Sequence, residues 1–283
     1  MKVFPHLTVV TLAAATVLAG AGAAFAGLGQ PSPWELGLQD AGSPVMADIV
    51  GFHTFLLWII SAITAFALIL LLFIMFRFYA RSNPTPSRTT HNTPIEIVWT
   101  IVPVIILVLI AIPSFRLLFT ELDIPTPDLT VKATGKQWYW SYAYPDNGNF
   151  EFDSLIVADK DLKPDQLRLL TVDNDMVVPV NKVVHVLVTG ADVIHSFAVP
   201  SFGIKIDAVP GRINETWFKA TTTGLFHGQC SELCGKDHGF MPITVQVVSD
   251  SEFTAWAAEA KQKFAGNAPA PSNAFASAGA AAH

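Results

Sequence analysis

The sequence predicts an α+β membrane protein in which an N-terminal two-helix transmembrane hairpin is followed by an exported all-β domain. Three observations lead to this prediction. Hydrophobic residues make up 51% of the 283 positions and charged residues only 14%, which is typical of membrane proteins. Two long uncharged runs lie within the first 120 residues, and alternation of apolar and polar residues dominates the chain after residue 121.

The first 26 residues form an apolar segment of a different kind. Met1 and Lys2 precede an Ala- and Leu-rich centre, and Ala24-Phe25-Ala26 supplies small residues just before Gly27. This order is typical of a secretory signal peptide, so residues 1–26 are predicted to be a cleaved signal. A third membrane span is the alternative.

Two further runs are each long enough to cross a bilayer. Residues 54–76 provide 23 uncharged positions and residues 97–115 provide 19 more. At about 1.5 Å per residue, both runs approach or exceed a hydrocarbon thickness of about 30 Å. We expect spans at about 54–78 and 95–118, within a segment 27–120 that begins with an exported N-terminal stretch.

The second span has a recognisable start. Thr93 and Glu96 fit a capping box, with Thr93 as the N-cap and Pro94 at the first helical position. Capping is therefore the role that the sequence alone favours for Glu96. Pro103 and Pro113 predict kinks or a broken last turn, because proline lacks a backbone N–H donor.

The charges of the loops predict how the hairpin is oriented. Arg77, Arg81 and Arg88 lie between the spans, whereas residues 27–53 carry three acidic residues and neither Lys nor Arg. Because short cytoplasmic loops are enriched in Lys and Arg, the linker is predicted to be cytoplasmic. Both ends of the mature chain are then exported.

Residues 121–264 are predicted to form the exported domain, an antiparallel sandwich or barrel of roughly 120 residues. Its alternating apolar positions include Leu129, Val131, Ala133, Val184, Val186, Val188, Ile243, Val245 and Val247. A helix is expected from Ser251 to about Phe264, with Ser251 or Asp250 as its N-cap. Residues 265–283 are rich in Ala, Pro and Ser and are expected to be disordered.

The predicted exported domain is acidic. From Glu121 onward, 19 Asp and Glu stand against 12 Lys and Arg, a net charge of −7 with His neutral. A surface of this sign attracts basic partners and accelerates their association in a salt-dependent way. Nucleic acid is not an expected partner.

The chain contains only two cysteines, Cys230 and Cys234, and both lie in one short run that also contains His238 and Met241. His195 lies 35 residues upstream of Cys230. Thiolate, imidazole and thioether are soft or borderline ligands that select copper over magnesium or calcium. The second thiolate exceeds the needs of a mononuclear site, and two sulfurs at one place could bridge two metal ions.

Two other interpretations of the cysteines stay open at this stage. In an oxidising compartment they could form a disulfide that closes a very small loop. A closed zinc site of two Cys and two His is also possible by ligand type, although it leaves Met241 without a role. Met241 or His195 alone would more often be a packing residue, so the copper hypothesis depends on the whole set.

An aromatic run occupies residues 137–144. In a strand, Trp138, Trp140, Tyr142 and Tyr144 would share one face and could form a thick core. Part of the run could instead lie at the surface, where a Trp ring offers a docking patch and a short electronic route to a buried metal. The spacing does not decide between these roles.

The run Gly228–Gly235, with His238 and the following Met241-Pro-Ile, resembles the signature of the subunit II family of cytochrome c oxidases. The likeness extends from about residue 50 to 260. Further matching segments are Thr93–Thr100 at the start of the second span, Gly135–Tyr144, Asp192–Ser196 and Asp207–Arg212. The resemblance implies a cupredoxin-like fold for the exported domain and a bacterial inner-membrane protein whose domain lies in the periplasm.

The family carries a dinuclear copper centre, CuA, in which two thiolates bridge two copper ions. The resemblance implies that its ligands are His195, Cys230, Cys234, His238 and Met241, together with the backbone carbonyl of Glu232. It also implies that the Glu232 carboxylate reaches a magnesium ion shared with subunit I.

The resemblance further implies a route for electrons and one for protons. Electrons from cytochrome c would enter through Trp138 and pass from CuA to the haem and copper of subunit I, where O₂ is reduced to water. Proton translocation would be coupled to this reaction, and Glu96 matches the acid at the mouth of a proton pathway. Subunit I, subunit III and membrane lipid are the other expected partners.

Many relatives carry an acid where this chain has Ala143, so docking of cytochrome c is expected to depend on other carboxylates. The candidates are Asp192, Asp173, Asp175 and Asp153. His227 lies beside the cysteine run, but the resemblance gives it no ligand role. The chain lacks a Cys-x-x-Cys-His haem motif, so the electron donor must be a separate molecule.

Two alternatives to this function remain. A quinol oxidase subunit would have the same architecture, but such subunits lack the copper ligands that are present here. A membrane-anchored copper carrier would have no catalytic partner, and it would leave the Glu96 and Glu232 matches unexplained.

Overall fold

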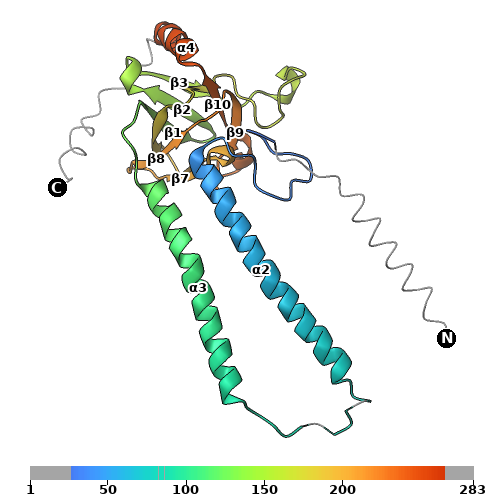
Figure 1. Ribbon diagram of the computed structural model, residues 1–283. Coiled ribbons are helices and arrows are strands. Elements are labelled where there is room, and N and C mark those ends of the chain that lie inside the picture. The colour runs from blue at the N-terminus through green and yellow to red at the C-terminus, as the bar shows by residue number, and fades with distance from the viewer. Residues whose placement is uncertain (1–26, 82, 86, 265–283) are drawn as a thin grey trace.

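The computed structural model describes residues 27–81, 83–85 and 87–264. The predicted signal peptide and the predicted disordered tail lie outside the described residues. Two long helices, α2 (Pro44–Arg77) and α3 (Thr93–Leu122), extend from one side of a β domain (Figure 1). The predicted fold class, a helical hairpin followed by a β-sheet domain, is confirmed.

Helix α2 begins ten residues before the predicted start at residue 54. The Ser43 hydroxyl caps its first turn by accepting from the Met46 amide at 3.0 Å, and it donates to the carbonyl of Phe202 at 2.7 Å. Val45 and Met46 are buried. The extra turns therefore anchor the helix to the β domain, and the apolar run marks only the part that is long enough to cross a membrane.

Helix α3 is capped one residue earlier than predicted. The N-cap is Asn92, whose side chain accepts from the Ile95 amide at 3.3 Å, while the Glu96 carboxylate accepts from the Asn92 amide at 3.1 Å. Thr93 is already helical, so the prediction of a Thr93 cap is wrong, although Glu96 does have a capping role. Of the two effects expected from Pro103 and Pro113, a kink or a broken last turn, the break does not occur, because helix α3 continues to Leu122 and each internal proline removes only a single donor.

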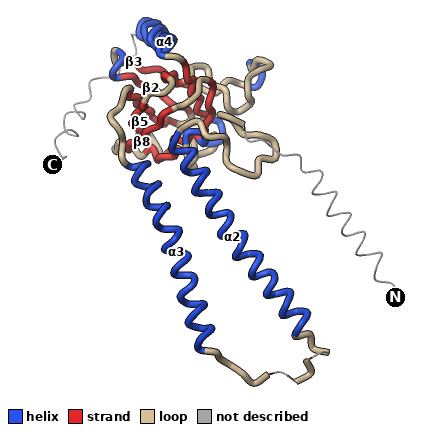
Figure 2. Tube along the Cα trace, viewed as in Figure 1, coloured by secondary structure: helices blue, strands red, loops and turns tan. Residues whose placement is uncertain are grey.

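Both helices are apolar along most of their length and stand apart from the strands (Figure 2). Each is long and hydrophobic enough to cross a membrane, and within its most apolar window none of the described side chains is buried inside the protein. Their surfaces must therefore be covered by lipid or by other protein.

Within the described residues the β domain contains a five-stranded sheet in the order β3-β2-β1-β5-β8, a three-stranded sheet β4-β10-β9 and a two-stranded sheet β6-β7. The strands are β1 (Leu129–Lys136), β2 (Tyr139–Tyr144), β3 (Phe150–Ser154), β4 (Met176–Pro179), β5 (Val183–Gly190), β6 (His195–Val199), β7 (Ile204–Ala208), β8 (Asn214–Lys219), β9 (Gly224–Gln229) and β10 (Pro242–Val248). Short 3₁₀ turns lie at η1 (Pro145–Asn147), η2 (Asp159–Asp161), η3 (Pro200–Phe202) and η4 (His238–Phe240).

The two larger sheets are mixed, which corrects the prediction of an antiparallel domain. Strand β1 pairs with β5 in parallel, and β10 pairs with β4 in parallel, whereas the other pairs are antiparallel. Parallel partners need long connections, and alternation of residue types carries no information about strand direction. The parallel pairs join segments that are far apart in the sequence.

The aromatic run is divided between the core and the surface. Trp140, Tyr142 and Tyr144 share one face of β2 and are completely buried, and the Tyr144 hydroxyl donates to the Val177 carbonyl at 2.8 Å. Trp138 precedes β2 and is only partly buried. Three of the four rings therefore form the core, and the fourth lies at its edge.

Helix α4 (Asp250–Lys263) packs over this aromatic core through Trp256, whose ring centroid lies 5.1 Å from that of Tyr144. Its N-cap is Ser249, and neither Asp250 nor Ser251 has this role. Ser249 and Glu252 form a reciprocal capping box, with the Glu252 carboxylate accepting from the Ser249 amide at 2.9 Å. The sequence prediction missed this cap, although Glu252 stands three residues after Ser249, which is the spacing that a capping box needs.

Candidate metal centre

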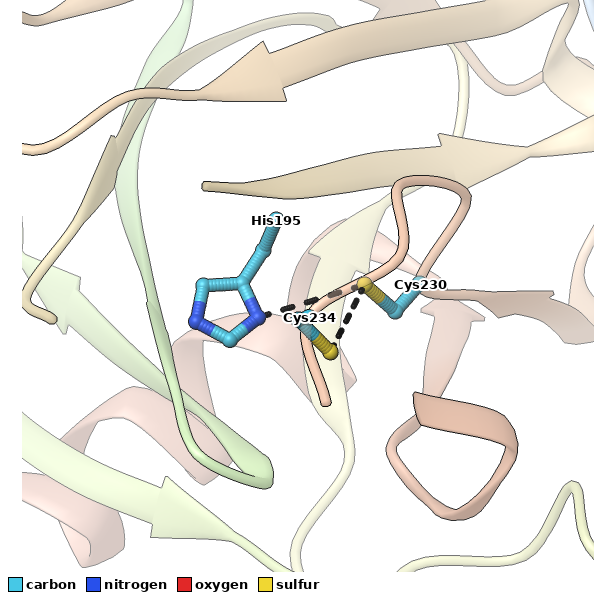
Figure 3. Close-up of side chains that lie close together, drawn as sticks. All are labelled: His195, Cys230 and Cys234. Carbon is cyan, nitrogen blue, oxygen red and sulfur yellow. Dashed lines mark hydrogen bonds between the residues drawn. The ribbon is translucent and has the colours of Figure 1, made fainter. Parts of the chain in front are cut away.

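The predicted ligands come from two parts of the β domain. The loop between β9 and β10 carries Cys230 and Cys234, whereas His195 is the first residue of β6. The Ser231 amide donates to the carbonyl of Ser196 at 3.0 Å, which attaches the loop to β6. Figure 3 shows the two sulfurs and the His195 ring pointing toward one another.

The two cysteines are free and buried, and their sulfur atoms lie 3.8 Å apart. A disulfide bond measures about 2.05 Å, so the disulfide interpretation does not describe this structure. A thiolate sulfur binds zinc at about 2.3 Å, and twice that length exceeds the observed separation of the two sulfurs. One metal ion can therefore bond to both sulfurs, as a bridged site requires.

Two other donors lie beside Cys230. The His195 Nδ1 atom is 4.0 Å from the Cys230 sulfur, and the Glu232 carbonyl oxygen is 3.3 Å from it. The His195 side chain is completely buried. An imidazole and a weak oxygen donor thus accompany the first sulfur.

The second sulfur has a similar pair of neighbours. The His238 Nδ1 atom and the Met241 thioether sulfur each lie 3.5 Å from the Cys234 sulfur. Met241 is buried, and His238 is partly exposed at the start of η4. Each thiol is therefore close to one imidazole and one weak donor, so the ligand set divides into two halves.

This division argues against a single tetrahedral zinc ion. Among the described residues, the donor atoms of His195, Cys230 and Cys234 all lie within 4.8 Å of one another, and His238 is not part of that group. A closed zinc site would need all four atoms around one centre. The soft donors and the nearby Met241 thioether instead fit a copper site.

The orientation of the His195 ring is fixed by contacts on the side opposite to the sulfurs. Its Nε2 atom lies 2.8 Å from a carboxylate oxygen of Asp192, and that carboxylate also accepts from the amides of Gln137 and Val193, each at 2.7 Å. A Cβ atom added to Gly135 would lie 2.8 Å from the ring. These contacts direct Nδ1 toward the sulfurs. An imidazole that binds a metal usually has its other ring nitrogen held in this way by a carboxylate or a carbonyl.

Trp138, which is partly exposed, lies against the same loop. Its indole N–H donates to the Cys234 carbonyl at 3.2 Å, and the Gln137 side-chain amide donates to the same oxygen at 3.0 Å. Lys236 lies over the indole ring at 5.6 Å from its centre. The sequence analysis missed Gln137, and only its position next to the aromatic run could have indicated it.

The pKa values of the two thiols are shifted in opposite directions. Burial raises the pKa of Cys230, but hydrogen bonds from His195 and from nearby backbone outweigh this effect and bring its pKa below the ordinary value. Burial and the neighbouring Cys230 thiolate raise the pKa of Cys234. The first proton is therefore lost readily, and the second is retained in the absence of a compensating positive charge.

The His195 ring has a raised pKa. Burial alone would lower it, but the contacts with Cys230 and with Asp192 more than offset that effect. His227, in contrast, has a pKa lowered by burial, and its Nδ1 atom faces the Leu170 carbonyl at 3.2 Å. This contact directs the Nδ1 atom of His227 to a neighbouring loop and leaves the ring outside the donor group.

The structure places the four candidate docking acids differently. Asp192 is exposed at the metal centre, and Asp153 is exposed on β3, where it forms a 3.5 Å ion pair with Lys136. Asp173 is exposed and accepts from the Leu155 amide at 2.7 Å. Asp175 is partly buried, and burial together with the charge of Asp173 raises its pKa to about 6. Asp175 is therefore the least accessible of the four.

The two glutamates lie in different regions. The Glu232 side chain is exposed on the loop that carries the cysteines. Glu96 lies in the first turn of α3, at the end of the hairpin away from the β domain (Figure 1). The metal centre and Glu96 are thus at opposite ends of the molecule.

Comparisons with known proteins agree with this architecture. Residues 129–248 match the family model "Cytochrome C oxidase subunit II, periplasmic domain", and residues 31–117 match "Cytochrome C oxidase subunit II, transmembrane domain". The chain is 55% identical over 238 residues to "Probable cytochrome c oxidase subunit 2" of Rickettsia bellii, covering 84% of this chain and 88% of the relative. It is 46% identical over 268 residues to "Cytochrome c oxidase subunit 2" of Cereibacter sphaeroides, covering 88% of each.

A solved structure is also similar to the exported part of the chain. The periplasmic domain of subunit II of cytochrome oxidase from Bradyrhizobium japonicum is 70% identical, with a TM-score of 0.48. The match covers 50% of this chain and 99% of that domain.

Proposed function

The chain belongs to the cytochrome c oxidase subunit II family, and from that premise we propose that its periplasmic domain binds two copper ions in a CuA centre. Its two membrane helices and periplasmic domain are those of this oxidase subunit. The observation that carries the proposal is a pair of free buried thiols 3.8 Å apart, each accompanied by one imidazole and one weak donor.

Six groups would hold the metals. They are the thiolates of Cys230 and Cys234, the imidazoles of His195 and His238, the Met241 thioether and the Glu232 carbonyl. When bound, the copper pair would take up and release one electron. The protein would hold its donors nearly fixed, because His195 is oriented by Asp192 and the cysteine loop is attached to β6.

Trp138 is the proposed point at which electrons enter. Its partly exposed ring can contact a donor protein, and its N–H bonds to the backbone of Cys234. This contact gives a short covalent and hydrogen-bonded route from the surface to a ligand. The proposed donor is a basic cytochrome c, attracted by the acidic domain and by Asp192, Asp173, Asp175 and Asp153.

The remaining proposals concern the rest of the oxidase. Subunits I and III are proposed partners, with subunit I receiving the electrons and reducing O₂ to water. The exposed Glu232 carboxylate is proposed to reach a magnesium ion shared with subunit I. Glu96, at the cytoplasmic end of α3, is proposed to admit protons while it caps the helix.

The rival functions are less consistent with these residues. A quinol oxidase subunit would not need the thiol pair and its four accompanying donors. A copper carrier would need an exchangeable metal, whereas the two cysteines, His195 and Met241 are all buried.

The copper content of the purified oxidase tests the proposed centre. We expect two coppers per chain at this site, with an unpaired electron shared between both nuclei in the mixed-valence state. Cys234→Ser should abolish that electron paramagnetic resonance signal, because one bridging ligand is lost. A single copper, or zinc, at this site of the unaltered protein would contradict the proposal.

Stopped-flow oxidation of reduced cytochrome c tests the role of Trp138. Trp138→Gln should slow electron transfer while leaving the copper content unchanged. Trp34→Gln is the matched control, since Trp34 is 91% exposed on the N-terminal segment and should not affect the rate. Equal rates for the two variants would remove Trp138 from the route.

A further inference from the structure

A cavity of about 420 Å³ lies between α2 and α3, near the ends that join the β domain. It shares no residue with the metal centre, and Glu96 lies in the first turn of α3, at the other end of that helix. The lining combines apolar side chains with one acid, one base and one hydroxyl. The lining includes Phe52, Phe55, Leu117, Asp48, Arg116 and Thr120.

The two charges in the lining are not neutralised by each other. Within the part of the chain that the structure describes, neither Asp48 nor Arg116 lies within 4.0 Å of an oppositely charged group. The Thr120 hydroxyl is already used, because it donates to the Arg116 carbonyl at 3.1 Å. A carboxylate and a guanidinium thus face the same cavity with their hydrogen-bonding capacity available.

The cavity lies at the level of the periplasmic membrane surface. Arg116 directly follows the uncharged run 97–115, and Phe55 is the second residue of the run 54–76. Asp48 precedes that run by six residues, about 9 Å along a helix. The charged lining is therefore at the depth of lipid headgroups, and the phenylalanines are at the depth of the first acyl carbons.

We propose that this cavity binds a phosphatidylethanolamine molecule of the outer leaflet. The planar guanidinium of Arg116 can bind a phosphate through two parallel hydrogen bonds. The Asp48 carboxylate can accept from the primary ammonium of the same headgroup. Phe52, Phe55 and Leu117 provide an apolar wall for the upper part of an acyl chain.

Charge complementarity selects this lipid among the common ones. The cavity presents one positive and one negative group, which matches a zwitterionic headgroup. An anionic phosphatidylglycerol would leave Asp48 without a cationic partner. A phosphatidylcholine has no N–H to donate, so the Asp48 carboxylate would lose its hydrogen bond.

A competition between lipids tests the proposal on the unaltered oxidase complex. The complex is stripped of lipid in detergent, supplied with phosphatidylethanolamine, phosphatidylcholine or phosphatidylglycerol, and examined by native mass spectrometry. One phosphatidylethanolamine should remain bound with about tenfold higher affinity than phosphatidylcholine, the size expected for one charge-assisted hydrogen bond. Equal retention of the three lipids would overturn the proposal.

Gly51→Leu supplies a variant that should fold and yet block the cavity. Gly51 lines the cavity, and a Cβ atom at this position would meet nothing within 4 Å. Replacing a helical glycine also favours the helix. The bound lipid should be lost in Gly51→Leu and kept in Gly51→Ala, whose methyl group leaves most of the space open. Lipid retention by Gly51→Leu would refute the assignment.

The charged residues provide the second set of variants. Arg116→Gln should weaken phosphatidylethanolamine binding about tenfold, and Asp48→Asn should remove the preference over phosphatidylcholine. Arg77→Gln, at the other end of α2, is the matched control and should change neither. A photoreactive residue at position 52 should label lipid, and labelling of another oxidase subunit at that position would replace the lipid with a protein occupant.

Discussion

Asp175 is predicted to destabilise the folded protein at neutral pH. The residue directly precedes β4 and lines a cavity with Trp256 and Phe264. Burial and the charge of Asp173 raise its pKa from 3.8 to about 6. Replacing it with Asn keeps the shape of the side chain and removes the charge.

The sign of the effect follows from proton linkage. The folded state binds the Asp175 proton more tightly than the unfolded state does, so its contribution to stability is complete below about pH 4 and is lost as the pH rises to about 6. One pKa unit corresponds to about 1.4 kcal/mol, which gives an upper limit of about 3 kcal/mol for this carboxyl. Because the side chain is partly exposed, we expect about half of that value.

Thermal unfolding of the detergent-solubilised chain measures the difference. At about pH 7.5, Asp175→Asn should raise the free energy of unfolding by about 1.5 kcal/mol, or Tm by about 3–6 °C. At about pH 4 the two proteins should unfold together. Asp165→Asn, a change at an exposed acid, should alter neither value. An Asp175→Asn protein that is less stable at pH 7.5, or equally stabilised at both pH values, would refute the reasoning.

Three other predictions concern the metal centre, a helix cap and the docking surface. Gly135→Ala should push His195 out of position and reduce copper retention against a chelator at least about tenfold, whereas Gly239→Ala, where a Cβ meets nothing within 4 Å, should retain copper normally. Ser249→Ala should lower the free energy of unfolding by about 1 kcal/mol in thermal melts, and Ser251→Ala should cost only a few tenths; equal losses would contradict the observed capping box. Raising the ionic strength from about 0.01 to about 0.15 M should weaken cytochrome c binding in a titration, since the Debye length falls from about 30 to about 8 Å; a constant Kd would contradict acidic docking.

The sequence located the membrane hairpin well because uncharged apolar runs of about 20 residues are rare outside membrane-spanning helices. It did not show that α2 begins ten residues before the predicted span, since Ser43 at the start of this helix bonds to Phe202 of η3, a contact that no local pattern shows. It also favoured Thr93 over Asn92 as a cap. Both residues are good caps, and the choice depends on which one the chain leaves outside the first turn.

The aromatic run illustrates a different limit. Alternation predicted that Trp138, Trp140, Tyr142 and Tyr144 share a face, which holds for the last three. Strand β2 begins only at Tyr139, so the alternation of side chains between the two faces does not extend to Trp138. Its ring lies against the Cys234 backbone. Periodicity predicts a face only inside an element, and the ends of elements depend on tertiary pairing.

The sequence by itself determined the chemical types of the donors, the membrane hairpin and the sign of the domain's charge, because each is a local property of side chains. Only the tertiary structure decided which donors meet. It placed His195 beside Cys230, divided the imidazoles and weak donors between two thiols, and directed Asp48 and Arg116 into one cavity. These distances depend on how remote strands and helices pack, and packing is set by the whole chain at once.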